Sequence, residues 1–310
     1  HYPWLNSYVK KGKELLKVYP QVLKKTKQCF IHKLGSFVQY QTAPFLIYEF
    51  SSLGAVALYG NYSLIVDKIM SLFTNMFAGT NASVGNLIAE GNKTVILNTY
   101  WELMALRTFI ATVVCVSTYI LIDPFISLWL GSEYILSHSI IILVLINAFI
   151  RIVRTTNDDF ACGYGMFWDV WSPIVEIIIN LTVAIVCGYL WGLPGVLLGG
   201  VCSLCIVICT WKPFFLFHWG FKTTYTSFLI GMFYNHLAIF LSILILLYIK
   251  SFISIAPQSS WLNWLLYSSI IVACYIPVLF LLFIFLSRGM RLFIQRIQNN
   301  YTCKLRIAHK

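Results

Sequence analysis

The sequence predicts an all-α integral membrane protein with about eight membrane-spanning helices. Hydrophobic residues make up 59% of the 310 positions, charged residues only 11%, and the mean hydropathy is +0.78. Soluble domains carry about 25% charged residues, so this chain is expected to fold in lipid. Its apolar runs are continuous rather than alternating, and the bilayer core gives the backbone no hydrogen-bond partners. The runs are therefore predicted to be helices.

Runs of about 20 apolar residues mark the predicted spans. They cover residues 34–53, 55–78, 101–122, 138–157, 170–190, 193–211, 226–249 and 264–286. The predicted organisation is a basic connector over 1–33, a six-span unit over 34–213, two further spans over 214–287 and a basic tail over 288–310. Because the chain opens on His1 without a signal-like segment, we expect either an internal fragment of a longer protein or a processed chain, and we favour the fragment.

Lys and Arg residues predict the orientation. They crowd before the first span and after the last, and those in the loops fall on the same side: Lys93, Arg151, Arg154, Lys212 and Lys222, with almost only Lys250 opposite. The positive-inside rule then places both chain ends in the cytoplasm. The net charge of +11 is accordingly interpreted as a topology signal, and no nucleic-acid partner is expected.

Cysteine usage points to no metal, cofactor or disulfide framework. Nine cysteines are present, most of them inside apolar runs, and no CxxC pair lies in a polar segment. Cys202, Cys205 and Cys209 share one helical face, which is interpreted as packing by small polarizable side chains rather than as a metal site.

Polar residues recur at helical spacing within three predicted spans. The stripes are Asn61, Lys68, Ser71 and Asn75 with Asp67 beside them; Asn147, Arg151, Arg154 and Asp158; and Asp169, Ser172, Glu176 and Asn180. Ionisable residues in a span are costly unless they face protein or water, so the stripes predict a wet cavity between helices. The alternative interpretation is that the arginines anchor the chain at the membrane boundary and the acids form packing ion pairs.

Five segments occur in a fixed order along the chain. They are FIHKLGSFV at 30–38, ALYGNYSLIVDKI at 57–69, ASVGNLIAEGNK at 82–93, GYGMFWDVWSPIVEIIINL at 163–181 and GLPGVLLGGVCS at 192–203. Together they resemble the C-terminal half of the polysaccharide-transport family, which belongs to the multidrug/oligosaccharidyl-lipid/polysaccharide exporter superfamily. The resemblance covers about residues 30–215, and the last two spans agree with it mainly in hydropathy.

The resemblance implies a MATE-like fold of two six-helix lobes around a cavity, of which this chain holds the second lobe and two extra helices. The implied activity is flipping of an undecaprenyl-pyrophosphate-linked oligosaccharide, an O-antigen or capsule repeat unit, across the bacterial cytoplasmic membrane. It proceeds by alternating access and makes or breaks no bond. The implied partners are the lipid-linked sugar, membrane lipid and the first lobe of the same protein.

We expect the basic and amide side chains of the stripes to bind the diphosphate: Lys68, Arg151, Arg154, Asn61, Asn75 and Asn147. Asp67, Asp158 and Glu176 are the candidates for holding a coupling proton or sodium ion. The sequence departs from the family pattern at Ala43–Pro44, where a polar stretch is common, and at Trp171, where a basic residue is common. Substrate contacts at those positions are not expected.

Two other functions remain open. A drug/cation antiporter of the same superfamily would need an acidic, aromatic cavity, whereas the fourth span carries Arg151 and Arg154. A membrane polysaccharide polymerase or ligase would need a large outer loop with catalytic charges, whereas the predicted outer loops are short.

Overall fold

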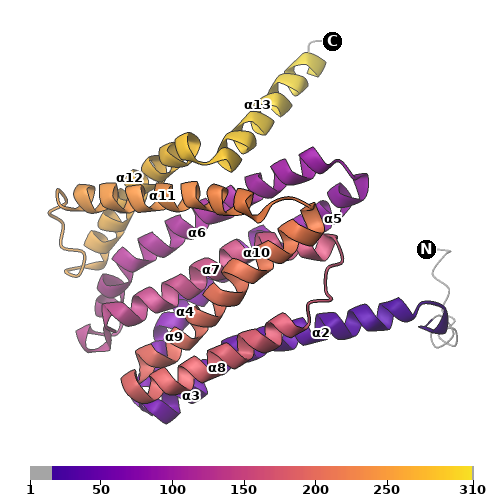
Figure 1. The fold of residues 1–310 in the computed structure, drawn as a ribbon. Coiled ribbons are helices and arrows are strands. Elements are labelled where there is room, and N and C mark those ends of the chain that lie inside the picture. Colours follow the sequence, from indigo (N-terminus) through magenta and orange to yellow (C-terminus); the bar gives the residue numbers. More distant parts are fainter. Residues whose placement is uncertain (1–15, 309–310) are drawn as a thin grey trace, which may run out of the picture.

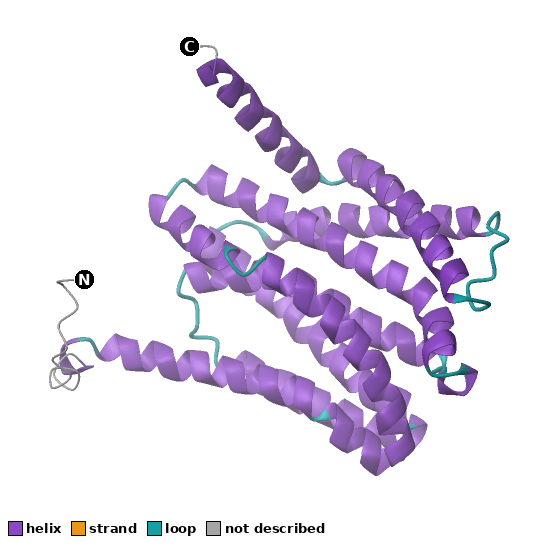
Figure 2. Cartoon of the chain, turned by 180° about the vertical axis from the view of Figure 1, so that it is seen from behind, coloured by secondary structure: helices purple, strands orange, loops and turns teal. Residues whose placement is uncertain are grey.

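The computed structural model describes residues 16–308, and this part of the chain is helical without any strand (Figure 2). The α-helices are α2 (Pro20–Gln41), α3 (Ala43–Phe50), α4 (Leu53–Met76), α5 (Thr80–Glu90), α6 (Lys93–Trp129), α7 (His138–Gly163), α8 (Trp171–Trp191), α9 (Leu193–Ser203), α10 (Lys212–Phe215), α11 (Tyr225–Lys250), α12 (Trp261–Leu286) and α13 (Arg288–Ala308). A 3₁₀ turn, η2, covers Ser132–Tyr134, and π-helical segments η3 (Leu204–Trp211) and η4 (Leu216–Phe221) flank α10. The first 15 residues of the predicted connector lie outside the described residues.

Six helices within residues 16–308 are long and apolar enough to cross a membrane, which confirms an all-α protein with membrane-spanning helices. They are α6, α7, α8, the continuous helix Leu193–Phe221, α11 and α12. The two other predicted spans, 34–53 and 55–78, are also helical, but α2, α3 and α4 do not meet the same criterion of length and hydropathy.

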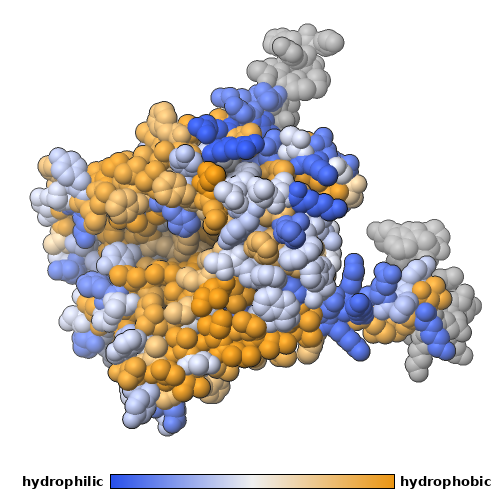
Figure 3. All heavy atoms as spheres, viewed as in Figure 1, coloured by the Kyte–Doolittle hydropathy of each residue, from blue (hydrophilic) through white to orange (hydrophobic). Residues whose placement is uncertain are grey.

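The helices pack side by side, and consecutive long helices alternate in direction (Figure 1). α8 packs against α9 and α2, α7 packs against α6 and α9, and α6 packs against α12, which pairs with α11. α2 starts beyond one end of the bundle, α5 lies at that end and α13 runs out toward it, while η2 and the connection from α11 to α12 lie at the other end (Figure 1). We call the end with α5 the basic end, because hydrophilic residues (blue) cluster there beside a broad hydrophobic surface (orange) in Figure 3.

Local sequence signals explain where several helices begin and end. The side chains of Ser52, Asn92 and Ser260 accept hydrogen bonds from the backbone N–H groups of the first turns of α4, α6 and α12, as N-caps do. α5 ends at Gly91, whose φ of 78° lies in the left-handed region. Glycine adopts this conformation without a steric clash because it has no Cβ atom.

The predicted first span, 34–53, differs from the structure in two respects. The helix α2 begins at Pro20, so it includes the second half of the predicted connector, and it ends at Gln41 before α3 begins. Pro44 lies in the first turn of α3, where it has no N–H to continue the hydrogen bonding of α2. The first span is therefore two consecutive helices rather than one.

Two loop predictions were wrong. Asp123 and Pro124 lie inside α6, which continues to Trp129, so the loop before α7 is shorter than predicted. Lys212 was placed in a loop, but the helix that starts at Leu193 continues past it to Phe221. The ammonium group of Lys212 lies 2.7 Å from the carboxylate of Asp169, so the helix can carry this charge without exposing it to an apolar environment.

Close contact between α8 and α9 depends on small residues. A Cβ atom added at Gly195 would overlap the backbone carbonyl of Cys187, and one added at Gly199 would crowd the backbone of Asn180 and Ala184. The two helices can therefore approach each other only where side chains are absent. This pair fixes the position of α8, which forms one wall of the candidate site.

We predict that Gly195→Ala destabilises the protein by about 1–3 kcal/mol, because a methyl group there meets backbone that cannot rotate away. Gly60→Ala in α4 is the matched control, since nothing lies within 4 Å of its added Cβ. Thermal unfolding in detergent, followed by size-exclusion chromatography, measures both. Equal melting temperatures for the two variants would contradict the close packing of α8 on α9.

Candidate functional site

Several cavities lie along α7, and the walls of two of them come from α2, α3, α4, α5, α7, α8, α9 and α10. The larger one, the basic-end cavity, has a volume of about 410 Å³ and is lined by residues such as His32, Lys33, Arg154, Glu176 and Lys212. The smaller one, the central cavity, has a volume of about 250 Å³ and is lined by Gln39, Tyr59, Asp67, Asn147 and Arg151, among others.

The basic-end cavity contains a charge cluster centred on Arg154. The Arg154 Nε atom lies 3.0 Å from Asp158 Oδ2, one helical turn further along α7, and Nη1 lies 3.9 Å from Glu176 Oε1 on α8. The Arg154 side chain is 14% exposed and that of Glu176 is 7% exposed, whereas the side chain of Asp158 is 45% exposed. Arg154 is therefore held between a buried acid and one that can turn toward solvent.

A second cluster closes the same cavity from the other side. Asp169, fully buried in the connection before α8, contacts Lys212 Nζ at 2.7 Å and His32 Nε2 at 3.3 Å, and accepts a hydrogen bond from Ser172 Oγ at 2.9 Å. Burial alone would raise the pKa of Asp169, but the contacts with His32 and Lys212 outweigh it and hold the pKa below its ordinary value of 3.8. Asp169 thereby joins α2 to α10 through one ionised carboxylate.

The central cavity contains an ion pair at the middle of the bundle. Arg151 Nη1 on α7 lies 2.8 Å from Asp67 Oδ1 on α4, and the two side chains are 34% and 56% exposed. Asn147 lies one turn away on the same cavity wall. An ion pair so exposed at the middle of an apolar bundle requires water or polar groups beside it.

The structure brings together six of the nine residues that the sequence singled out. Arg154, Asp158 and Glu176 line the basic-end cavity, while Asp67, Asn147 and Arg151 line the central cavity. Asn61, Lys68 and Asn75 line neither: Lys68 and Asn75 are exposed on the outer face of α4, and Asn61 is half-buried. The polar stripe of α4 thus points away from the cavities except at Asp67.

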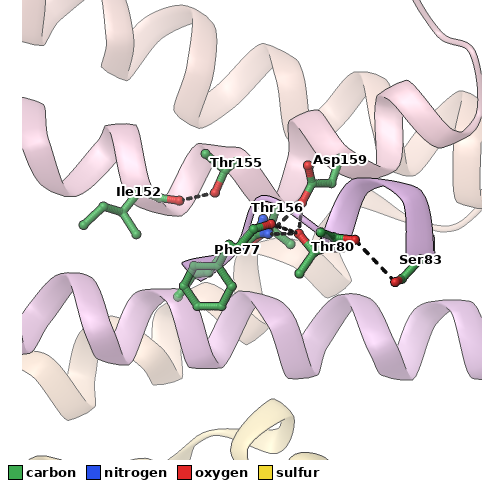
Figure 4. Close-up of polar contacts among 9 residues, drawn as sticks. Phe77, Thr80, Ser83, Ile152, Thr155, Thr156 and Asp159 are labelled. Carbon is green, nitrogen blue, oxygen red and sulfur yellow. Dashed lines mark hydrogen bonds and ion pairs between the residues drawn. The ribbon is translucent and has the colours of Figure 1, made fainter. Parts of the chain in front are cut away.

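The largest fully buried side chain in the described part of the chain, Arg107, was not among the predicted residues. Its Nη2 atom lies 2.6 Å from Asp159 Oδ2 on α7 and 2.6 Å from Thr80 Oγ1 at the start of α5, and its guanidinium group lies 4.9 Å from the ring centre of Phe77. Figure 4 shows Thr80 and Asp159 meeting between these helices, with Phe77 and Thr156 beside them. The cluster holds α5, α6 and α7 together at the basic end.

Signals for the missed residues were present in the sequence. Arg107 lies inside the predicted span 101–122, where any ionisable residue needs a partner. His32 precedes a predicted span and was interpreted only as a connector residue, and Lys212 follows a predicted span and was interpreted only as a loop residue.

Within residues 16–308, no group of three His, Cys, Asp or Glu side chains has a geometry that would hold a metal ion. The arrangement is suited to binding charged groups reversibly.

No family of known proteins, no curated protein and no solved structure matches this chain. The resemblance to polysaccharide transporters therefore stays a prediction, and the geometry of the two cavities carries the functional argument.

We predict that Asp159→Ala destabilises the protein by about 3–5 kcal/mol, because it leaves the buried Arg107 guanidinium without its carboxylate. Replacing both partners, as Arg107→Leu with Asp159→Leu, is expected to recover most of that loss. Unfolding midpoints in detergent provide the comparison, with the exposed Glu90→Ala as control. A double variant as unstable as the single one would show that the ion pair is not the source of the effect.

The lowered pKa of Asp169 predicts a specific pH dependence of stability. The ionised form is favoured in the folded protein, so its contribution is complete above the unfolded pKa and is lost as the pH falls below about 4 through the folded pKa. For the native protein, the melting temperature should decrease as the pH is lowered through this range. Asp169→Asn should already be less stable at neutral pH and should show a smaller fall; parallel curves would contradict the assignment.

Proposed function

We propose that the chain is part of a transporter that carries a lipid-linked sugar diphosphate across a bacterial cytoplasmic membrane, with the diphosphate bound in the basic-end cavity. The observation that carries the proposal is the convergence of basic side chains from three elements on one cavity: His32 and Lys33 of α2, Arg154 of α7 and Lys212 of α10. A volume of about 410 Å³ accommodates a diphosphate and part of an attached sugar.

Charge explains why such a cavity is needed. A diphosphate cannot cross hydrocarbon unaided, because burying its charge without partners is prohibitive. Arg and Lys side chains compensate it with short, charge-assisted hydrogen bonds. The six apolar helices supply a membrane-embedded frame for these side chains, and no covalent step is required of them.

The acidic residues of the cavity make binding reversible in this proposal. Without substrate, Arg154 is neutralised by Asp158 and Glu176. An incoming phosphate replaces Asp158, whose half-exposed carboxylate can turn to water, while Glu176 stays buried. The substrate phosphate and the Asp158 carboxylate thus compete for Arg154. The substrate is released when Asp158 binds Arg154 again. Protonation or sodium binding at Asp158, Glu176 or Asp67 would shift this exchange and couple it to an ion gradient.

The outer face of α4 supports the further proposal that a second protein body covers this side of the bundle. Asp67 and Arg151 are partly exposed at mid-bundle, and Lys68 and Asn75 are exposed beside them. Lipid tails are a poor environment for these groups. A first lobe of MATE-like architecture facing α4 would enclose the central cavity and provide a path between the two sides of the membrane. The proposal also includes the predicted topology of eight membrane spans with both ends of the chain in the cytoplasm.

The alternative is a drug/cation antiporter. Asp158, Asp159 and Glu176 line the basic-end cavity together with Phe167 and Phe215, and such acidic and aromatic groups suit an organic cation. Each of the three acids, however, lies within 4 Å of an arginine side chain. Asp158 and Glu176 share Arg154, so one acid charge of that trio is balanced in the cavity only by Lys33. The exposed ammonium group of Lys33, which forms no ion pair among the described residues, is the feature that favours an anion.

The proposal predicts that loss of cavity cations weakens substrate binding and slows flipping. Full-length protein, including the proposed first lobe, is reconstituted in sealed vesicles with undecaprenyl-pyrophosphate-linked oligosaccharide, and transfer between leaflets is measured. Lys33→Gln, and Arg154→Gln combined with Glu176→Gln, should weaken substrate binding about 10- to 100-fold, as expected for a lost charged hydrogen bond. The double variant removes Arg154 without leaving the acid on α8 unpaired.

Lys250→Gln, at the other end of the bundle, is the matched control and should flip substrate at the native rate. Native rates in the cavity variants would refute the proposed site. A native protein that flips no sugar lipid but drives efflux of an organic cation would establish the antiporter instead.

A further inference from the structure

We infer that the basic end of the bundle binds the anionic phospholipid headgroups of the adjoining leaflet through the first turns of α2 and the first turns of α13. The two helices come from opposite ends of the chain and project from the same end of the bundle (Figure 1). The inference is independent of what the cavities carry.

Uncompensated positive charge marks both helices. Every lysine between residues 16 and 33 is exposed, namely Lys17, Lys24, Lys25, Lys27 and Lys33, and this stretch contains no acidic residue. Residues 287–310 also contain no Asp or Glu. Within the described residues, none of these five lysines forms an ion pair.

The acidic residues near this end are already engaged with arginine and lysine side chains of the bundle. Glu102 pairs with Arg296 at 3.0 Å, Asp159 with Arg107 and Asp169 with Lys212, while Asp158 and Glu176 flank Arg154. Among the described residues at this end, Glu90, at the end of α5, is an exposed carboxylate without an ion pair, and Asp158 is half-exposed but paired with Arg154. The lysines of α2 therefore have almost no anionic partner within the protein.

Exposed apolar side chains accompany the lysines on α2. Leu23, Phe30 and Leu34 recur at steps of seven and four, so they share one helical face, and they are 45%, 65% and 47% exposed. Lys24 and Lys33 flank this face on its two sides, and Lys27 lies within it, one turn from Leu23. An apolar face bordered by lysines is the arrangement of a helix that lies in the headgroup region, with its apolar side chains among the acyl chains and its lysines on phosphates.

The start of α13 is fixed in a position that presents its arginines. Gly289 packs against the backbone of Trp101 on α6, and Arg296 is held by Glu102. Arg288 and Arg291 are exposed, and Arg291 also donates a hydrogen bond to the carbonyl of Phe285 at the end of α12. Because α12 is one of the membrane-capable helices, both arginines lie at the level where a span leaves the bilayer.

The test places the protein in nanodiscs of phosphatidylcholine alone and in nanodiscs that also contain phosphatidylglycerol. Backbone amide exchange of residues 16–30 and 288–299 is followed by mass spectrometry. We expect exchange to slow at least about tenfold with the anionic lipid, and the effect to disappear at high salt. Lys24→Gln with Lys25→Gln and Lys27→Gln should abolish the slowing in α2, whereas Lys250→Gln should keep it.

Equal exchange rates in the two kinds of nanodisc would overturn the inference, as would persistence of the lipid effect in the triple variant. If soluble RNA slows exchange equally in phosphatidylcholine nanodiscs, the surface binds polyanions generally, and the assignment to lipid is overturned. None of the substituted lysines lines either cavity, so failure here leaves the transport proposal untouched.

Discussion

The arrangement of the bundle depends on the ion pairs of α7, because a helix in an apolar environment can carry charge only where a neighbouring helix supplies the opposite charge. Arg151 is matched by Asp67 on α4, Arg154 by Glu176 on α8, and Asp159 by Arg107 on α6. These ion pairs therefore fix the rotation of α4, α6 and α8 about their own axes relative to α7. Apolar packing brings the helices together, but it does not by itself distinguish one rotation from another.

The same pairs line the cavities. Arg154 and Glu176 border the basic-end cavity, and Asp67 and Arg151 border the central cavity. Between α8 and α9, by contrast, Gly195 and Gly199 allow backbone contact. One wall of the basic-end cavity is therefore rigid, and the wall at Lys212 lies between two π-helical segments, a geometry frequent at functional sites.

Sequence periodicity could predict which residues of α7 and α8 face inward, because the angle between positions on one helix follows from its 3.6-residue repeat. The five cavity residues on α7 and α8 were found in this way, whereas Asp67 on α4 was noted only as the neighbour of Lys68. Periodicity carries no information on partners, so the pairing of Asp67 with Arg151 and the contribution of His32 from α2 needed the structure. Arg107 was missed for a different reason: it is the only charged residue between Glu102 and Asp123, so it was not assigned to a stripe, and its partners come from two other helices.

The orientation of α4 shows how core packing overrides a polar stripe. Tyr62, Val66 and Met70, at steps of four, are the buried residues of this helix. Their burial fixes the rotation of α4, which leaves Asp67 at the edge of the core, within reach of Arg151, and turns Lys68 and Asn75 outward. Since Arg151 lies halfway along a membrane-capable helix, that outward face is at a depth where lipid would have to solvate a lysine. A polar face that the fold itself exposes at this depth argues that its natural neighbour is water or protein.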